Sequence, residues 1–138
     1  MTADEIIAAA RSELGTPFAH QGRIPGKRLD CAGLLIRVAF LLDVPVVDHG
    51  GYARRPSNGL LESALDNQPG IEPCPVSLTP GLMFLMRFKG EPQHLGICAG
   101  ETLIHAYEPT GKVCEHRIDD VWRRRIVRAY RFKEMIHE

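Results

Sequence analysis

The stretch RLDCAGLLIRVAFLL, residues 28–42, decides the fold, because it predicts a central helix with a thiol in its first turn. Apolar residues recur at helical spacing over 34–42 and form a wide face, which is typical of a buried helix. Asp30 is the expected N-cap, because a carboxylate accepts hydrogen bonds from the free N–H groups of a first turn. Cys31 then stands where those N–H groups and the helix dipole favour a thiolate. Cys31 is therefore either a small core residue or a nucleophile.

The neighbouring acid introduces a conflict into this prediction. A carboxylate that points at a thiol raises the pKa of that thiol. We therefore expect the Asp30 carboxylate to point away from Cys31, towards the helix N–H groups or towards a cation on a substrate.

Composition and charge limit the class of protein. The chain has 138 residues, of which 44% are hydrophobic and 25% are charged, which is typical of one compact globular domain over 1–138. Lysine and arginine balance aspartate and glutamate at 17 each, so no net charge favours nucleic acid or an anionic membrane as a partner. No run reaches the ~18 apolar residues of a membrane span. The arginines at 123–125, 128 and 131 are expected to form a solvated strand or turn face.

The N-terminus and the cysteines bear on the compartment. The start MTADEIIAAARSEL carries acidic residues and lacks the basic region of a signal peptide, so we expect synthesis in the cytoplasm without one. The cysteines at 31, 74, 98 and 114 fit no zinc-binding spacing, and disulfides are not expected in that compartment. Cys98 lies in the apolar run HLGICAG and is expected to be a buried packing residue.

The order of the predicted elements is helices first and strands second. Residues 3–14 form an amphipathic helical pattern, with Thr2 as N-cap and Glu5 as its capping-box partner. Residues 15–29 are expected to be a loop, and residues 59–66 a short helix capped by Asn58. The runs LMFLMRF, HLGICAG, ETLIHAY, KVCEHRI and RIVRAYRF predict an antiparallel sheet of about four to six strands. This separation of helices from strands is the α+β class.

Histidines supply the base that a nucleophilic cysteine needs. His94 begins one predicted strand, and His105 lies on the next, after a turn at Gly100. In an antiparallel hairpin the start of one strand faces the end of the next, so we expect the two imidazoles to lie roughly opposite each other. One would accept the thiol proton and the other would orient the first. Two alternatives remain: ordinary half-exposed strand histidines, or a metal site formed by Cys31, His94 and His105.

Several blocks of sequence, all in order, resemble the NlpC-type cysteine peptidases, which are papain-like cell-wall hydrolases. The blocks are LGTPFAHQGR with LDCAGLL, PGLMFLMR, HLGICAG and LIHAY, and they cover about residues 10–107. The resemblance implies a papain-like fold, with N-terminal helices packed on the antiparallel sheet. It implies that Cys31 is the nucleophile, that His94 is the general base and then the acid for the leaving amine, and that His105 is the third, orienting residue. It implies no metal and no organic cofactor.

The resemblance also implies a substrate. The family cleaves peptide bonds in bacterial peptidoglycan stem peptides, commonly between D-glutamate and the diamino acid, and Asp30 would hold the free amino end of that peptide. The insert GGYARRPSNGLLESAL and the absence of a signal peptide resemble most the branch found in bacteriophage tails and gene transfer agents. That branch would add other tail proteins as partners and a virion or tail particle as the location.

The chain departs from the family pattern beside the nucleophile. Ala32 stands where relatives often carry serine, and Phe18 stands where they often carry tyrosine. His20 and Gln21 fall in a stretch that is usually Trp-Gly-Gly, and we expect one of them to supply a polar donor to the oxyanion. Phe18, His20 and Gln21 are thus expected to contact the substrate together with Asp30. These departures leave open a second function, a catalytically weak structural or assembly component of a phage tail or gene transfer agent on the same scaffold.

Overall fold

A computed structural model describes residues 1–48, 50, 59–88 and 91–136. The helices are α1 (Ala3–Arg11), α2 (Cys31–Leu41), α3 (Leu60–Asp66), the 3-10 helix η1 (Glu108–Thr110) and α4 (Asp120–Arg125). The strands are β1 (Arg23–Ile24), β2 (Arg28–Leu29), β3 (Ile71–Cys74), β4 (Met83–Phe88), β5 (Glu91–Cys98), β6 (Thr102–Tyr107), β7 (Lys112–Arg117) and β8 (Ile126–Phe132).

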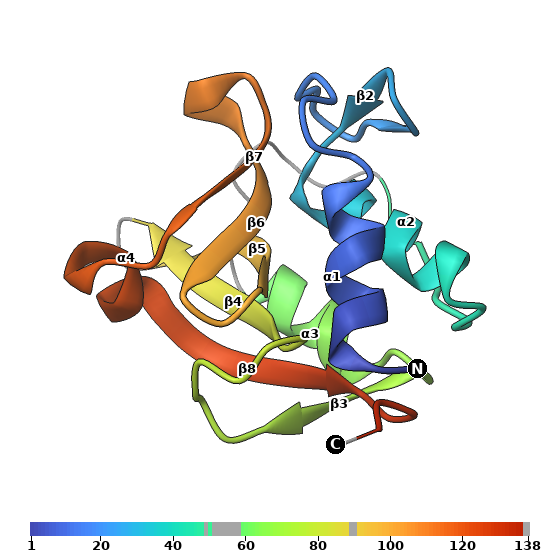
Figure 1. The fold of residues 1–138 in the computed structure, drawn as a ribbon, viewed down its shortest axis with the longest axis vertical. Coiled ribbons are helices and arrows are strands. Elements are labelled where there is room, and N and C mark those ends of the chain that lie inside the picture. Colours follow the sequence, from blue (N-terminus) through green and yellow to red (C-terminus); the bar gives the residue numbers. More distant parts are fainter. Residues whose placement is uncertain (49, 51–58, 89–90, 137–138) are drawn as a thin grey trace.

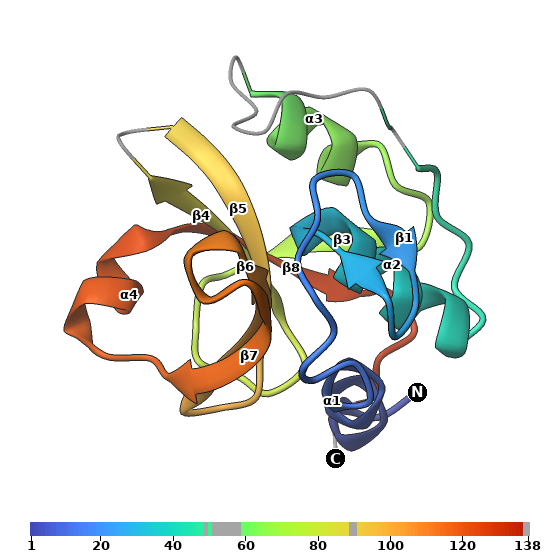
Figure 2. The same ribbon diagram turned by 90° about the horizontal axis from the view of Figure 1, so that it is seen from above.

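A six-stranded antiparallel sheet forms the centre of the molecule, with the strand order β3-β8-β4-β5-β6-β7. Helices α1 and α2 pack against each other and against β5 on one side of this sheet, as Figures 1 and 2 show. The core lies between these two layers. The predicted α+β arrangement, with N-terminal helices on an antiparallel sheet, is therefore confirmed. Among the described residues, none of the helices has the length and apolarity that crossing a bilayer requires.

Helix α1 begins with the predicted capping box. The Thr2 hydroxyl accepts a hydrogen bond from the Glu5 N–H at 3.2 Å, and the Glu5 carboxylate accepts one from the Thr2 N–H at 3.1 Å. The helix ends at Arg11, three residues before the predicted end. Gly15 then adopts a left-handed φ of 88°, and its N–H donates to the Val113 carbonyl of β7 at 2.9 Å. The contact with the sheet therefore ends this helix early.

Helix α2 begins where the sequence predicts, because the Asp30 carboxylate accepts a hydrogen bond from the Gly33 N–H at 2.8 Å. Leu34 and Val38 are fully buried against the sheet. Leu41, which the pattern places on the apolar face, is exposed instead, because the helix ends there. The first turns of α2 therefore provide its buried contacts with the sheet.

The predicted loop over 15–29 contains the two short strands β1 and β2, which the sequence did not reveal. A buried carboxylate outside the loop organises it: Glu13 accepts hydrogen bonds from the Thr16 hydroxyl at 3.0 Å and from the Gly26 N–H at 2.8 Å. Strands of two residues have no periodicity to detect. The loop is therefore held in place by Glu13, which precedes it in the sequence.

Two further elements were missed. Strand β3 pairs with β8 at the edge of the sheet and contains Pro73, which edge strands tolerate. Helix α4 follows its N-cap Asp119, whose carboxylate accepts a hydrogen bond from the Trp122 N–H at 2.9 Å. The short helix predicted over 59–66 is confirmed as α3, which follows Gly59 in a left-handed conformation. Its predicted cap, Asn58, lies outside the described residues.

The arginine cluster is not the single solvated face that its sequence suggested. Residues 123–125 form the last turn of α4. Arg128 instead binds the Glu62 carboxylate of α3 at 2.8 Å, and Arg131 binds Glu72 of β3 at 2.7 Å. The prediction of one solvated strand or turn face is wrong, because these arginines lie on two elements, α4 and β8. The two on β8 form ion pairs with α3 and β3.

Gly33 has no room for a side chain. A Cβ atom built there would lie 2.3 Å from the Gly22 carbonyl oxygen, where the loop crosses the start of α2. A glycine-to-alanine change normally stabilises a helix by ~0.5–1 kcal/mol. We expect Gly33→Ala to destabilise the protein by at least about 1 kcal/mol instead, because backbone must move. Urea unfolding measures this, and an unchanged or higher stability would contradict the close approach.

Candidate functional site

Three histidines from three neighbouring strands form a hydrogen-bonded chain. Nε2 of His94, on β5, lies 2.5 Å from Nδ1 of His105, on β6. Nε2 of His105 lies 2.8 Å from Nε2 of His116, on β7. Nδ1 of His116 lies 2.9 Å from the carbonyl oxygen of Arg117. The predicted pair is therefore brought together, with a third imidazole behind it.

The strand register differs from the predicted one. β5 and β6 pair Ile97 with Ile104, and continuing this register places Gly96, not His94, opposite His105. His94 is two residues further along β5, so it shares the same face and meets His105 diagonally. The expectation that the two histidines lie opposite each other is thus corrected by two residues.

His116 was missed because the sequence analysis did not extend the register to β7. β6 and β7 pair His105 with Cys114. His116 lies two residues beyond Cys114 and therefore points to the same face as His105. Four of the six ring nitrogens pair with one another, and among the described residues no three His, Cys, Asp or Glu side chains are arranged to hold a metal ion.

The histidines are buried under aromatic side chains. His94 is 7% exposed and His105 is 0% exposed. The ring of Tyr107 stacks on His105 at 4.9 Å between centroids, and Trp122 meets the same imidazole edge-on at 5.1 Å. This enclosure removes water from both imidazoles.

Burial makes the two histidines neutral. It lowers the pKa of His94 to about 3, with the positive charge of Arg125 as the next cause. It lowers the pKa of His105 to about 2, with the neighbouring His94 as the next cause. Near neutral pH both imidazoles are therefore uncharged, which is the state a general base requires.

Cys31 is the first residue of α2, as predicted, but its thiol is not ionised. Burial raises its pKa to about 12, and the charge of Asp30 raises it further. The backbone N–H groups of Leu95 and Ala32, together with Arg23, act in the opposite direction and are weaker. The predicted thiolate is thus wrong for the free protein, because desolvation outweighs the helix N-terminus.

The position of the thiol nonetheless fits the predicted role. The N–H of Leu95 faces the sulfur of Cys31. Leu95 directly follows His94 on β5. The start of α2 therefore lies against the segment of β5 that carries His94, with the second ring nitrogen of His94, Nδ1, on the side not bonded to His105.

The carboxylate of Asp30 is engaged by donors other than the thiol. It accepts hydrogen bonds from the Gly33 N–H at 2.8 Å, the Gln21 N–H at 2.9 Å and the Arg23 guanidinium at 2.7 Å. Arg23, which the sequence analysis missed, also binds Asp48 at 2.9 Å. A substrate ammonium at Asp30 would have to share the carboxylate with Arg23.

The remaining candidates lie in the loop before α2. The Phe18 N–H donates to the Gly111 carbonyl at 2.8 Å, and the Phe18 side chain packs partly buried against the core. The side-chain amide nitrogen of Gln21 lies 3.4 Å from Nε2 of His20. The backbone of Gln21, with φ of 57°, is held at the helix start by Asp30. Contact of Phe18, His20 and Gln21 with a substrate stays a prediction.

Solved structures share the fold of this chain. The chain matches an NlpC/P60 family protein from Bacillus cereus ATCC 10987 with a TM-score of 0.70 and 19% identity, over 96% of this chain and 40% of that one. It matches the NlpC/p60 domain of the peptidoglycan hydrolase SagA with a TM-score of 0.60 and 25% identity, over 94% of this chain and 97% of that one. This chain has the NlpC/P60 fold. The P60 domain of an antigen from M. avium subspecies paratuberculosis matches with a TM-score of 0.60 and 18% identity, over 94% of this chain and 93% of that one.

No protein-family model matches the chain, and no curated protein matches it. The chain spans 40% of the length of the Bacillus protein. The papain-like fold predicted from the sequence is confirmed.

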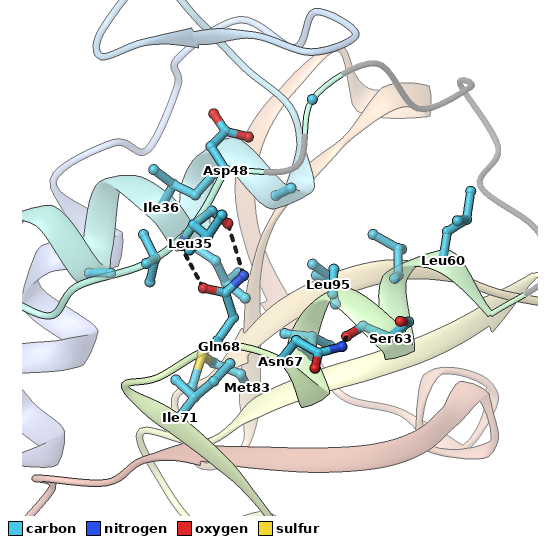
Figure 3. Close-up of a pocket in the computed structure, with 18 of the residues that line it drawn as sticks. Leu35, Ile36, Asp48, Leu60, Ser63, Asn67, Gln68, Ile71, Met83 and Leu95 are labelled. Carbon is cyan, nitrogen blue, oxygen red and sulfur yellow. Dashed lines mark hydrogen bonds between the residues drawn. The ribbon is translucent and has the colours of Figure 1, made fainter.

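In this NlpC/P60 fold an apolar cavity of about 370 Å³ lies between α2, α3 and the sheet (Figure 3). Leu35 of α2 and Leu95 of β5 contribute to its wall. The polar groups of the wall are bonded to the chain itself: the Gln68 amide forms hydrogen bonds with the backbone N–H and carbonyl of Val47 at 2.7 and 2.9 Å. Ala32 and Leu95 line the cavity and also flank Cys31. An apolar group bound here would lie next to the thiol.

Acid should destabilise the protein through His94 and His105. Their folded pKa values lie below the unfolded value of about 6.5, so the unfolded state binds more protons and stability falls as the pH falls below that value. Each histidine can cost up to about 2 kcal/mol between pH 7 and pH 5. Urea unfolding at both pH values should show a smaller loss for His105→Asn than for the wild type. His20→Asn, outside the buried cluster, is the matched control. An equal loss in all three proteins would contradict this assignment.

Alkylation should report the protonated state of Cys31. Because the thiol pKa is raised to about 12, the rate of carbamidomethylation by iodoacetamide should still be rising at pH 9. Peptide mass spectrometry should find Cys31, which is partly exposed, labelled before the buried Cys98. A rate that is already constant from pH 6 would show a preformed thiolate instead. Cys74→Ala serves as the control for labelling elsewhere.

Proposed function

We propose that this protein is a cysteine peptidase that hydrolyses peptide bonds in bacterial peptidoglycan stem peptides. The observation that carries the proposal is the meeting of Cys31, at the start of α2, with the segment of β5 whose His94 is bonded to His105. The shared fold supports it, since one of the matched structures is a domain of a peptidoglycan hydrolase.

The first half of the reaction is acyl transfer to sulfur. His94 is neutral, and its Nδ1 takes the thiol proton as the sulfur of Cys31 attacks the scissile carbonyl carbon. The thiol is protonated in the free protein, so this transfer accompanies the attack and does not precede it. His94 then gives the proton to the departing amine as the C–N bond breaks. The product is a thioester on Cys31.

Water completes the cycle. His94 takes a proton from a water molecule, whose oxygen attacks the thioester carbonyl, and the C–S bond breaks to release the carboxylate and restore the thiol. The oxyanions of both halves need N–H donors. Asp30 occupies the Gly33 N–H and the Ala32 N–H interacts with the sulfur of Cys31, so we assign this role to the backbone N–H of Cys31 in the first turn. The side chains of Gln21 and His20, at the mouth of the same turn, are further candidate donors.

The substrate details are inferences from the family resemblance. We infer that the bond cleaved joins D-glutamate to the diamino acid, with Phe18 and Asp30 on the binding surface. We also infer that the protein acts as a cell-wall hydrolase of a phage tail or gene-transfer-agent particle, in contact with other tail proteins. The raised pKa of Cys31 favours one rival, a catalytically weak assembly component on the same scaffold.

Muropeptide analysis tests the proposed function. Purified wild type should release shorter stem peptides from bacterial sacculi, as read by mass spectrometry, and Cys31→Ala should release none because no sulfur remains to form the thioester. Cys74→Ala, which removes a thiol far from the histidines in sequence and on the edge strand β3, should cleave normally.

The outcomes separate the rival functions. Cleavage by Cys31→Ala would rule out the thiol mechanism. A wild type that folds, leaves sacculi intact and still joins tail particles would favour the assembly component.

A further inference from the structure

We propose that His116 is a positioning residue, which fixes the tautomers of His105 and His94 and so leaves Nδ1 of His94 without a proton. The chain of hydrogen bonds from the Arg117 carbonyl to His94 carries this inference. It rests on the proposed function only in taking His94 as the base for Cys31.

The Arg117 carbonyl, at the end of the row of three imidazoles, sets the direction of the hydrogen bonds between them. A carbonyl oxygen can only accept a hydrogen bond, so Nδ1 of His116, 2.9 Å from the Arg117 oxygen, must carry a proton. We take His116 as a neutral imidazole, which has one N–H. Nε2 of His116 is therefore an acceptor.

The tautomer of each imidazole fixes the tautomer of the next one. Nε2 of His105, 2.8 Å from Nε2 of His116, must donate to it, which leaves Nδ1 of His105 as an acceptor. Nε2 of His94 must then donate to Nδ1 of His105. The only nitrogen of His94 without a proton is Nδ1. Burial, which lowers the pKa of both His94 and His105, keeps these two rings neutral.

The opposite direction would disable the base. If His105 carried its proton on Nδ1, Nε2 of His94 would have to accept, and the proton of His94 would sit on Nδ1, where a base must be empty. The observed direction also suits the next step of the reaction. When Nδ1 of His94 takes up a proton, its Nε2–H still donates to His105, so no hydrogen bond is lost.

The surroundings supply no other anchor for the chain. Among the described residues, no carboxylate forms a hydrogen bond with any of the three imidazoles. The positive charge of Arg125 acts on His94, but its guanidinium, which lies over the rings of Trp122 and Phe88 at 4.5 and 4.7 Å, cannot accept a hydrogen bond. Trp122 also covers His116, with 4.8 Å between ring centroids. The backbone carbonyl of Arg117 thus has the orienting task that an aspartate has in serine-protease triads.

Nitrogen NMR of the wild-type protein tests the tautomers directly. In protein labelled with 15N-histidine, His94 and His105 should carry their protons on Nε2, and His116 should carry its proton on Nδ1. His116→Phe keeps an aromatic ring but can neither accept from His105 nor donate to Arg117, so it should produce mixed tautomers at His94. His116→Gln, whose amide can do both, should retain the wild-type tautomer.

Kinetics on soluble muropeptides provides the second measurement. In His116→Phe, kcat should fall on the order of 10- to 1000-fold with KM changed less than about twofold, because binding is not altered, and His116→Gln should recover most of the rate. A wild-type His94 protonated on Nδ1 would overturn the proposal, as would a His116→Phe variant with unchanged tautomers and kcat. If the tautomers are as expected but no muropeptide is cleaved, the proposed function fails and the role of His116 stands. If His116→Phe does not fold, the wild-type spectrum and His116→Gln still decide.

Discussion

The carboxylate of Asp30 holds the site together. It joins the first turn of α2, the loop at Gln21 and the guanidinium of Arg23 through three hydrogen bonds, and it is buried. A buried carboxylate is stable only with such partners, so the three segments must meet there. Cys31 is positioned by the same arrangement. Burial raises the pKa of the Cys31 thiol, and the charge of this carboxylate raises it further, so the thiol is protonated in the free protein.

In the proposed mechanism, activation of the thiol therefore depends on the histidines. Their burial beneath Tyr107 and Trp122 makes them neutral, and a neutral imidazole is a base only if the correct nitrogen is free. The sheet aligns the imidazoles so that they bond to one another, because β5, β6 and β7 each contribute one imidazole to the same face. A backbone carbonyl at the end of that line gives it a direction. The Cys31 thiol and the His94 imidazole are thus both uncharged in the free protein.

Part of the fold and of the site was predictable, because it depends on residues that are close together in the sequence. The capping box at Thr2 and the N-cap at Asp30 are local hydrogen bonds, so three or four residues of sequence suffice to find them. The strands of the central sheet follow from apolar runs between turns. The two-residue strands β1 and β2 could not be found this way, because Glu13 and the packing on α2 hold them in place. Strand β3 likewise owes its existence to its partner β8.

The sequence by itself determined where the helix of Cys31 begins, that helices precede strands, and that His94 and His105 share a sheet. Each of these depends on local spacing and residue chemistry. Only the tertiary structure decided that the thiol is protonated, that Arg23 binds the Asp30 carboxylate, and that His116 forms a hydrogen bond with His105. Desolvation and strand register are set by residues far apart in the chain, so the charge on a side chain and the partner of an imidazole become defined only when the layers pack.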